Sequence, residues 1–194
     1  MSDWGPERIA ALFTRDGQYL CARWGRPIAT VIFGLAEESL GIFRSVTAAA
    51  LAHAGIAQAE TDPEMGANML GFFVRDWDEL DGIPDLDLLT GQPDLAARLK
   101  AQGADQYRLF RFDPDGGIRA CITLVNMSGA LADAHPAELA ETLVMRALLT
   151  FARDVTPSPE LAALIRAAYD PTLPVVARDP VHALRLAARL AVGR

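Results

Sequence analysis

The sequence predicts a single α+β domain over residues 1–194, with a mixed or antiparallel sheet, a β-hairpin and packed helices. Strand-like and helix-like segments follow one another irregularly, which is typical of α+β folds. The chain has 194 residues, of which 51% are hydrophobic and 22% charged, so it can bury one sizeable core. Because no repeat or low-complexity linker divides the chain, we expect one domain.

The first third of the chain is expected to contain two helices and two extended segments. Residues 27–33 are rich in β-branched side chains and end at Gly34, a pattern typical of a strand. In Glu37–Ala54 the apolar residues recur on one helical face, and Gly55 follows where glycine commonly ends a helix. The predicted ranges are 6–14 (helix), 18–24 (extended or edge strand), 27–33 (strand) and Glu37–Ala54 (helix).

The middle of the chain combines an apolar strand with an acidic segment. Residues 66–74 are almost continuously apolar, as expected of a central strand. From Asp76 to Asp94 there are seven acidic residues and no basic one, interrupted by glycines and prolines. We therefore expect one short helical turn and a long surface loop in this acidic segment, followed by a helix over residues 93–102.

The second half of the sequence predicts a hairpin followed by helices. Two apolar or alternating segments flank a turn of Asp, Pro and Gly residues, which supply the backbone conformations that a chain reversal needs. The helices that follow show apolar residues at helical spacing. The predicted ranges are Gln106–Phe112 and Ile118–Asn126 (hairpin), 136–153 and 159–169 (helices), 171–180 (extended) and 180–192 (amphipathic helix).

Charge and composition exclude several classes of partner. The net charge is −7, so the surface as a whole attracts neither nucleic acid nor anionic lipid, and no apolar run approaches the ~20 residues of a membrane span. The first residues are acidic and polar, unlike a secretory signal, which predicts a cytoplasmic protein. Cys21 and Cys121 each lie in an apolar stretch and are expected to be buried thiols.

No strong catalytic motif is present in the sequence. Glycine-rich phosphate loops and the Gly-x-Ser-x-Gly nucleophile turn are absent, and the three histidines are isolated from one another. We therefore expect no cofactor and no metal. The candidates for a site assembled from the fold are His135, Glu138 and Glu141, which lie at the start of the helix predicted at 136–153.

Four short segments carry a resemblance to a known family. RWGRPI (23–28) leads into a strand and a long helix, GAN (66–68) leads into an apolar strand, AELAE (137–141) begins a helix and AYDP (168–171) ends the next one. This layout, over roughly residues 20–190, resembles the zincin-like proteobacterial proteins grouped as domain of unknown function 2927. The resemblance implies a zincin-like fold.

The resemblance also shows where this chain departs from zincin chemistry. Zincin proteases hold zinc with a His-Glu-x-x-His helix, in which the glutamate activates a water. In the matching helix Glu138 takes the glutamate position, whereas Ala137 and Glu141 occupy the positions of the two histidines. Since the alanine side chain has no donor atom, the resemblance implies a zincin scaffold without its zinc.

Three functional hypotheses remain open from the sequence. The first is a non-catalytic, metal-free scaffold that self-associates or binds a protein partner, with the amphipathic helix at 180–192 docking on its own core or on a second copy. The second is a small-molecule-binding protein with a cleft edged by residues 66–68 and Arg75. The third is an enzyme whose site assembles around His135, Glu138 and Glu141.

Overall fold

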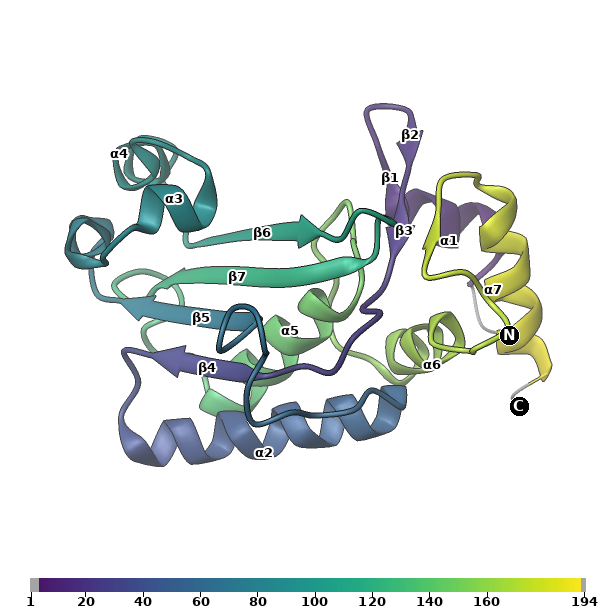
Figure 1. Cartoon of the computed structure of the whole chain (residues 1–194), viewed down its shortest axis with the longest axis horizontal. Helices are drawn as coiled ribbons and strands as arrows, with labels where there is room; N and C mark the ends of the chain where they lie inside the picture. Colours follow the sequence, from purple (N-terminus) through teal and green to yellow (C-terminus); the bar gives the residue numbers. More distant parts are fainter. Residues whose placement is uncertain (1–3, 193–194) are drawn as a thin grey trace.

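The structure, a computed structural model, describes residues 4–192 and is built around a four-stranded mixed sheet. Strands β4 (Thr30–Phe33), β5 (Met69–Val74) and β7 (Ile118–Asn126) run parallel, and β6 (Gln106–Phe112) lies antiparallel to β7 at the edge, in the order β4-β5-β7-β6 (Figure 1). The predicted α+β class with a mixed sheet is confirmed, as are the hairpin and the central position of β5.

One face of the sheet is covered by two helices, α2 (Glu37–Ala54) and α5 (Pro136–Leu148) (Figure 1). Phe43 of α2 meets Phe73 of β5 edge to face, with ring centroids 5.1 Å apart, and Leu139 of α5 joins the same buried cluster. Helix α2 has the predicted bounds, and Gly55 ends it with a φ of 74°, a conformation that glycine adopts without a side-chain penalty.

The acidic segment covers part of the opposite face of the sheet. It forms a 3₁₀ helix, η1 (Trp77–Gly82), and helix α3 (Leu86–Thr90), followed by α4 (Leu95–Ala101). Trp77, Leu80 and Leu86 are buried in one cluster with the sheet residues Phe72 and Leu124. The expectation of a single helical turn and a long surface loop was wrong, because apolar residues between the acidic ones anchor the segment to the sheet.

A second layer of short helices and strands lies at one end of the sheet (Figure 1). It consists of helices α1 (Pro6–Phe13), α6 (Pro159–Ala168) and α7 (Val181–Val192), with the short strand pairs β1 (Thr14–Arg15) with β2 (Gln18–Tyr19) and β3 (Cys21–Ala22) with β8 (Val176–Ala177). Helix α7 packs on α1 and α6 and buries Ala183 and Leu186. The amphipathic C-terminal helix therefore docks on the chain's own core.

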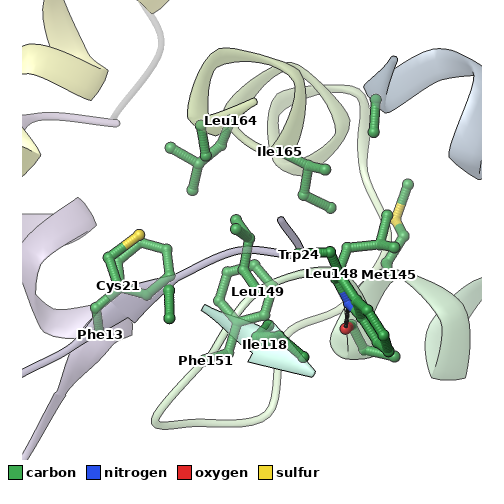
Figure 2. Close-up of a cluster of buried hydrophobic side chains, with 14 of the residues drawn as sticks. Phe13, Cys21, Trp24, Ile118, Met145, Leu148, Leu149, Phe151, Leu164 and Ile165 are labelled. Atoms are coloured by element: carbon green, nitrogen blue, oxygen red, sulfur yellow. Dashed lines mark hydrogen bonds between the residues drawn. The ribbon is translucent and has the colours of Figure 1, made fainter. Parts of the chain in front are cut away.

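The largest apolar core joins this layer to the end of α5. Figure 2 shows Trp24, Leu148 and Leu149 beneath Leu164 and Ile165 of α6, and the Trp24 indole Nε1 donates to the Ala147 carbonyl at 2.8 Å. The cluster contains Ile9 of α1 and Leu186 of α7 together with Met69 and Ile118 of the sheet. It therefore connects the flanking layer to the main sheet.

Helix α5 ends five residues earlier than the predicted 136–153, at Leu148. Leu149 is extended, with φ −140° and ψ 159°, and pairs with Arg23 as an isolated bridge. The Thr150 hydroxyl donates to the Leu20 carbonyl and accepts from the Ala22 N–H, so the chain leaves the helix to join β3. Leu148 and Phe151 are both buried, and their spacing of three residues is the apolar signal that predicts a longer helix.

Candidate functional site

A groove of about 430 Å³ lies between helices α2, α5 and α6, and we call it the α2–α5–α6 groove. Its floor is apolar and buried, formed by Met145 and Leu148 of α5 and Ile165 of α6. Its walls carry small side chains, mostly alanine, because α2 and α6 present alanines where they approach α5. The lining residues are Val46, Ala49, Ala50, His53, Ala137, Glu138, Glu141, Met145, Leu148, Ala162 and Ile165.

Acidic side chains form the rim of this groove. Glu138 and Glu141 are three residues apart on α5, a spacing that places them on one helix face. Both are exposed, and neither takes part in an ion pair within residues 4–192. His53, from the last turn of α2, lies with Nε2 3.1 Å from the Ala162 carbonyl and ties α2 to α6. The groove therefore combines an apolar floor with two unneutralised carboxylates.

The structure brings together two of the three residues that the sequence suggested for a site. Glu138 and Glu141 line the groove, whereas His135 caps the N-terminus of α5, its Nδ1 accepting from the Ala137 N–H at 3.3 Å. The histidine that reaches the groove is His53. Its spacing from Val46, Ala49 and Ala50 on α2 places it on their helix face, a signal that the sequence contained.

The described part of the chain contains no cluster of side chains that could bind a metal ion. No three His, Cys, Asp or Glu side chains there are placed to hold a metal ion. On α5 the methyl group of Ala137 lines the groove at the position where the resemblance would place a zinc ligand. Cys21 and Cys121 are buried, and burial raises the pKa of each thiol to about 12.

The structure separates residues 66–68 from Arg75, which the sequence placed at the edges of one cleft. These residues lie at opposite ends of β5, roughly 25 Å apart at about 3.3 Å per strand residue. Asn68 is instead fully buried, and its amide donates to the Pro27 carbonyl and to Asp62 while its oxygen accepts from the Ala29 N–H at 2.8 Å. Asn68 thus fastens the start of β5 to the segment that leads into β4.

A set of paired charges surrounds Asn68, and we call it the Asp62 junction: Arg26, Asp62, Glu64, Asn68 and Asp113. Arg26 lies 2.7 Å from Asp113, 3.6 Å from Asp62 and 3.7 Å from Glu64. Burial alone would raise the pKa of Asp62, but two backbone N–H groups and the Arg26 charge outweigh it and hold the pKa below its ordinary value. Every charge of the junction has a partner, which marks it as structural.

Two other cavities fit a ligand less well than the groove. The wider one, about 1170 Å³ between α2, α6 and α7, has only Ala54 buried among its lining residues, so it has no desolvated floor. The smaller one, about 30 Å³ between the sheet and α2 and α5, has room for one water beside the unpaired hydroxyls of Thr30 and Thr47. It is far too small for an organic ligand.

Three comparisons with known proteins found no protein similar to this chain. A scan against protein-family models matched no family, and searches of curated proteins and of solved structures found no similar chain. None of the helices described is long and apolar enough to cross a membrane. Fold and site together define an α+β protein with an apolar groove and an acidic rim.

Proposed function

We propose that this chain is a non-catalytic binding protein whose α2–α5–α6 groove holds an amphiphilic cation. The apolar part of the ligand would lie on Met145, Leu148 and Ile165, and its amine or guanidinium would meet Glu138 and Glu141. The observation that carries this proposal is the pair of unneutralised carboxylates beside a buried apolar floor. An apolar pocket with a few convergent polar groups is the usual form of a small-molecule site.

The size and charge of the groove support the same ligand class. Its volume of about 430 Å³ falls within the roughly 300–1,000 Å³ typical of ligand pockets. The net charge of −7 adds a long-range attraction for cations. The alanine walls leave room for a ligand body where larger side chains would close the groove.

A binding function suits the groove better than catalysis. His135 caps α5 and lies apart from the groove, so the acid–base set of His135, Glu138 and Glu141 does not assemble. Helix α5 follows the hairpin of β6 and β7 and carries Ala137 at the position of a zinc ligand in zincin proteases. The proposed relation to zincin-like proteins is therefore consistent with a binding role. We infer that the scaffold has been kept for binding.

The test is a ligand panel of arylalkylamines and the matching arylalkyl carboxylates, measured by thermal shift and isothermal titration. Amines are expected to bind and raise Tm, and carboxylates of the same size are not. The double variant Glu138→Gln/Glu141→Gln should weaken amine binding about tenfold or more, since each loses a charge-assisted contact.

Glu60→Gln is the matched control, because it removes an exposed carboxylate away from the groove. It should bind amines as the wild type does. Equal binding by amines and carboxylates, or equal loss in Glu60→Gln and in the double variant, would contradict the proposal.

Self-association is a second candidate, supported by the free edge of β4. Val31 and Phe33 are 37% and 47% exposed, on the part of the sheet's acidic-segment face that this segment does not cover. Among residues 4–192, β5 is the one strand that pairs with β4. An open strand edge with apolar side chains is a surface on which a second copy can add. Light scattering should show a dimer that Phe33→Lys converts to a monomer, and a monomeric wild type at high concentration would refute it.

A further inference from the structure

Strand β6 carries an arginine, Arg108, that forms no ion pair within residues 4–192. Arg108 pairs across the strands with Thr123, which lines the small cavity under α2 and α5, so Arg108 lies on the helix-covered face of the sheet. It is half-buried, with its guanidinium 5.6 Å from the Phe110 ring centroid. Within residues 4–192 no hydrogen bond or ion pair engages this guanidinium.

A second arginine reaches the same place from α5. Arg146, in the last turn of α5, donates from Nε to the Val155 carbonyl at 2.9 Å and from Nη1 to the side-chain oxygen of Gln106 at 3.4 Å. Among residues 4–192, the carboxylate that pairs with Arg146 is that of Asp154, 3.3 Å away. The Arg146 side chain is 13% exposed and that of Asp154 82%, so solvent screens this pair from the Asp154 side.

A third arginine comes from the β1–β2 hairpin. Arg15 donates from Nη2 to the Ala152 carbonyl at 3.1 Å, so it holds the same segment after α5 that Arg146 holds at Val155. Burial lowers the pKa of Arg108, and the charges of Arg146 and Arg15 lower it further, while the charge of Asp154 acts in the opposite direction. We call Arg15, Arg108 and Arg146 the arginine cluster.

The arginine cluster concentrates positive charge in an acidic chain. Within the described residues one exposed carboxylate, that of Asp154, forms an ion pair with these three guanidinium groups, although the whole chain has a net charge of −7. Like charges in a partly desolvated place repel one another, and an oxyanion between them removes that cost. The planar donor fork of arginine matches the oxygens of phosphate or carboxylate, and Arg108 has all of its donors available for such a ligand.

We propose that the arginine cluster is a binding site for a phosphoryl oxyanion, either inorganic phosphate or a phosphomonoester, with Arg108 as the principal ligand. Arg15 and Arg146 each keep donors beyond those already used on carbonyl and amide oxygens. The site is separate from the α2–α5–α6 groove, because it lies where β6, the C-terminal turn of α5 and the β1–β2 hairpin meet. The inference therefore does not depend on the proposed function.

The experiment is a titration of the full chain with inorganic phosphate and, separately, with phenyl phosphate, followed by thermal shift and isothermal titration calorimetry. Ionic strength is matched with sodium chloride, since salt screens exposed charges. Saturable binding of phosphate to the wild type is expected, and Arg108→Gln should weaken it about tenfold or more. Tighter binding of phenyl phosphate than of inorganic phosphate would identify a phosphomonoester as the better occupant.

Arg75→Gln is the matched control, because Arg75 is an exposed arginine at the end of β5 and outside the cluster. It should bind phosphate as the wild type does. Arg15→Gln changes an exposed side chain, so it keeps the test decisive if Arg108→Gln does not fold, and it too should weaken binding. No saturable phosphate binding beyond the chloride control, or equal binding by the wild type and a folded Arg108→Gln or Arg15→Gln, would overturn the proposal.

Discussion

The Asp62 junction and the α2–α5–α6 groove both gather charged side chains, but they differ in how those charges are satisfied. In the junction, Asp62 accepts from two backbone N–H groups and from Asn68, and it forms an ion pair with Arg26 at 3.6 Å. In the groove, Glu138 and Glu141 face solvent with no ion-pair partner among residues 4–192. The junction holds the loops that enter β4 and β5, whereas the groove leaves its charges available.

This difference distinguishes polar side chains that stabilise the fold from polar side chains that are available to bind a ligand. A buried polar group without partners costs free energy, so a fully paired cluster is explained by the fold alone. Exposed carboxylates contribute little to stability, and beside an apolar floor the proposed function gives Glu138 and Glu141 a role in binding. Substitutions in the junction should therefore change stability, and substitutions in the groove should change binding.

The largest effect is expected for Asn68→Ala. It removes the side chain that satisfies the Ala29 N–H and joins the Pro27 carbonyl to Asp62, so buried polar groups lose their partners. We expect the free energy of unfolding to fall by about 3 kcal/mol, measured by urea denaturation.

Asn126→Ala is the control for that measurement, because the chain has only one other asparagine and Asn126 bonds locally to Ser128 at the end of β7. Its cost should stay below about 1 kcal/mol. Equal losses in the free energy of unfolding for the two variants would mean that the Asp62 junction does not stabilise the fold more than a local surface hydrogen bond does.

The next effect is a loss of stability in acid that depends on Asp62. Its pKa in the folded chain lies below the ordinary value of 3.8, so its stabilisation is fully present above pH 3.8 and is lost as the pH falls through the folded pKa. Asp170 contributes in the same direction: the Thr172 hydroxyl and Arg189 lower its pKa to about 2.

Thermal unfolding between pH 5 and pH 2 should therefore show a steep fall in Tm for the wild type. Asp62→Asn should be less stable than the wild type at pH 5 and lose less Tm on acidification. Parallel pH profiles for the two proteins would show that Asp62 is not ionised more readily in the folded state.

A groove variant should separate binding from stability. Ala49→Trp places an indole into the α2–α5–α6 groove from an exposed position on α2, and it should weaken amine binding about tenfold or more by occupying the ligand volume. Ala48→Trp changes the neighbouring exposed alanine, which does not line the groove, and should leave binding unchanged. If both tryptophans act alike, the groove is not where the ligand binds.

The smallest effect on stability is expected for Glu141→Gln. An exposed carboxylate without an ion-pair partner should change the free energy of unfolding by less than about 0.5 kcal/mol, as measured by urea denaturation. A loss comparable with that of Asn68→Ala would show that the groove carboxylates belong to the fold.

The sequence predicted the fold class and several elements because their signals are local. Helix α2 was found from its apolar spacing and Gly55, and the hairpin from its turn residues. Helix α5 was predicted too long because its end is set by Thr150, which bonds to backbone groups near β3, about 130 residues earlier in the chain. The spacing of apolar residues along a helix does not indicate a hydrogen-bond partner so distant in the sequence.

The candidate site was only partly predictable for the same reason. Glu138 and Glu141 were found because they share one helix face, but His53 joins them only through the packing of α2 against α5. The arginine cluster unites β1, β6 and α5, which no spacing in the sequence relates. Conversely, His135 was favoured for its place beside Glu138 in the sequence, and the fold uses it as a helix cap.

The most direct measurement is a ¹H–¹⁵N NMR titration of the wild type with an arylalkylamine, with backbone amides assigned. The groove predicts saturable shifts concentrated at the amides of Ala49, Ala50, His53 and Ala162, and their loss in Glu138→Gln/Glu141→Gln. Shifts that are absent, that never saturate, or that concentrate around the Asp62 junction instead would contradict the claim that the α2–α5–α6 groove is the binding site.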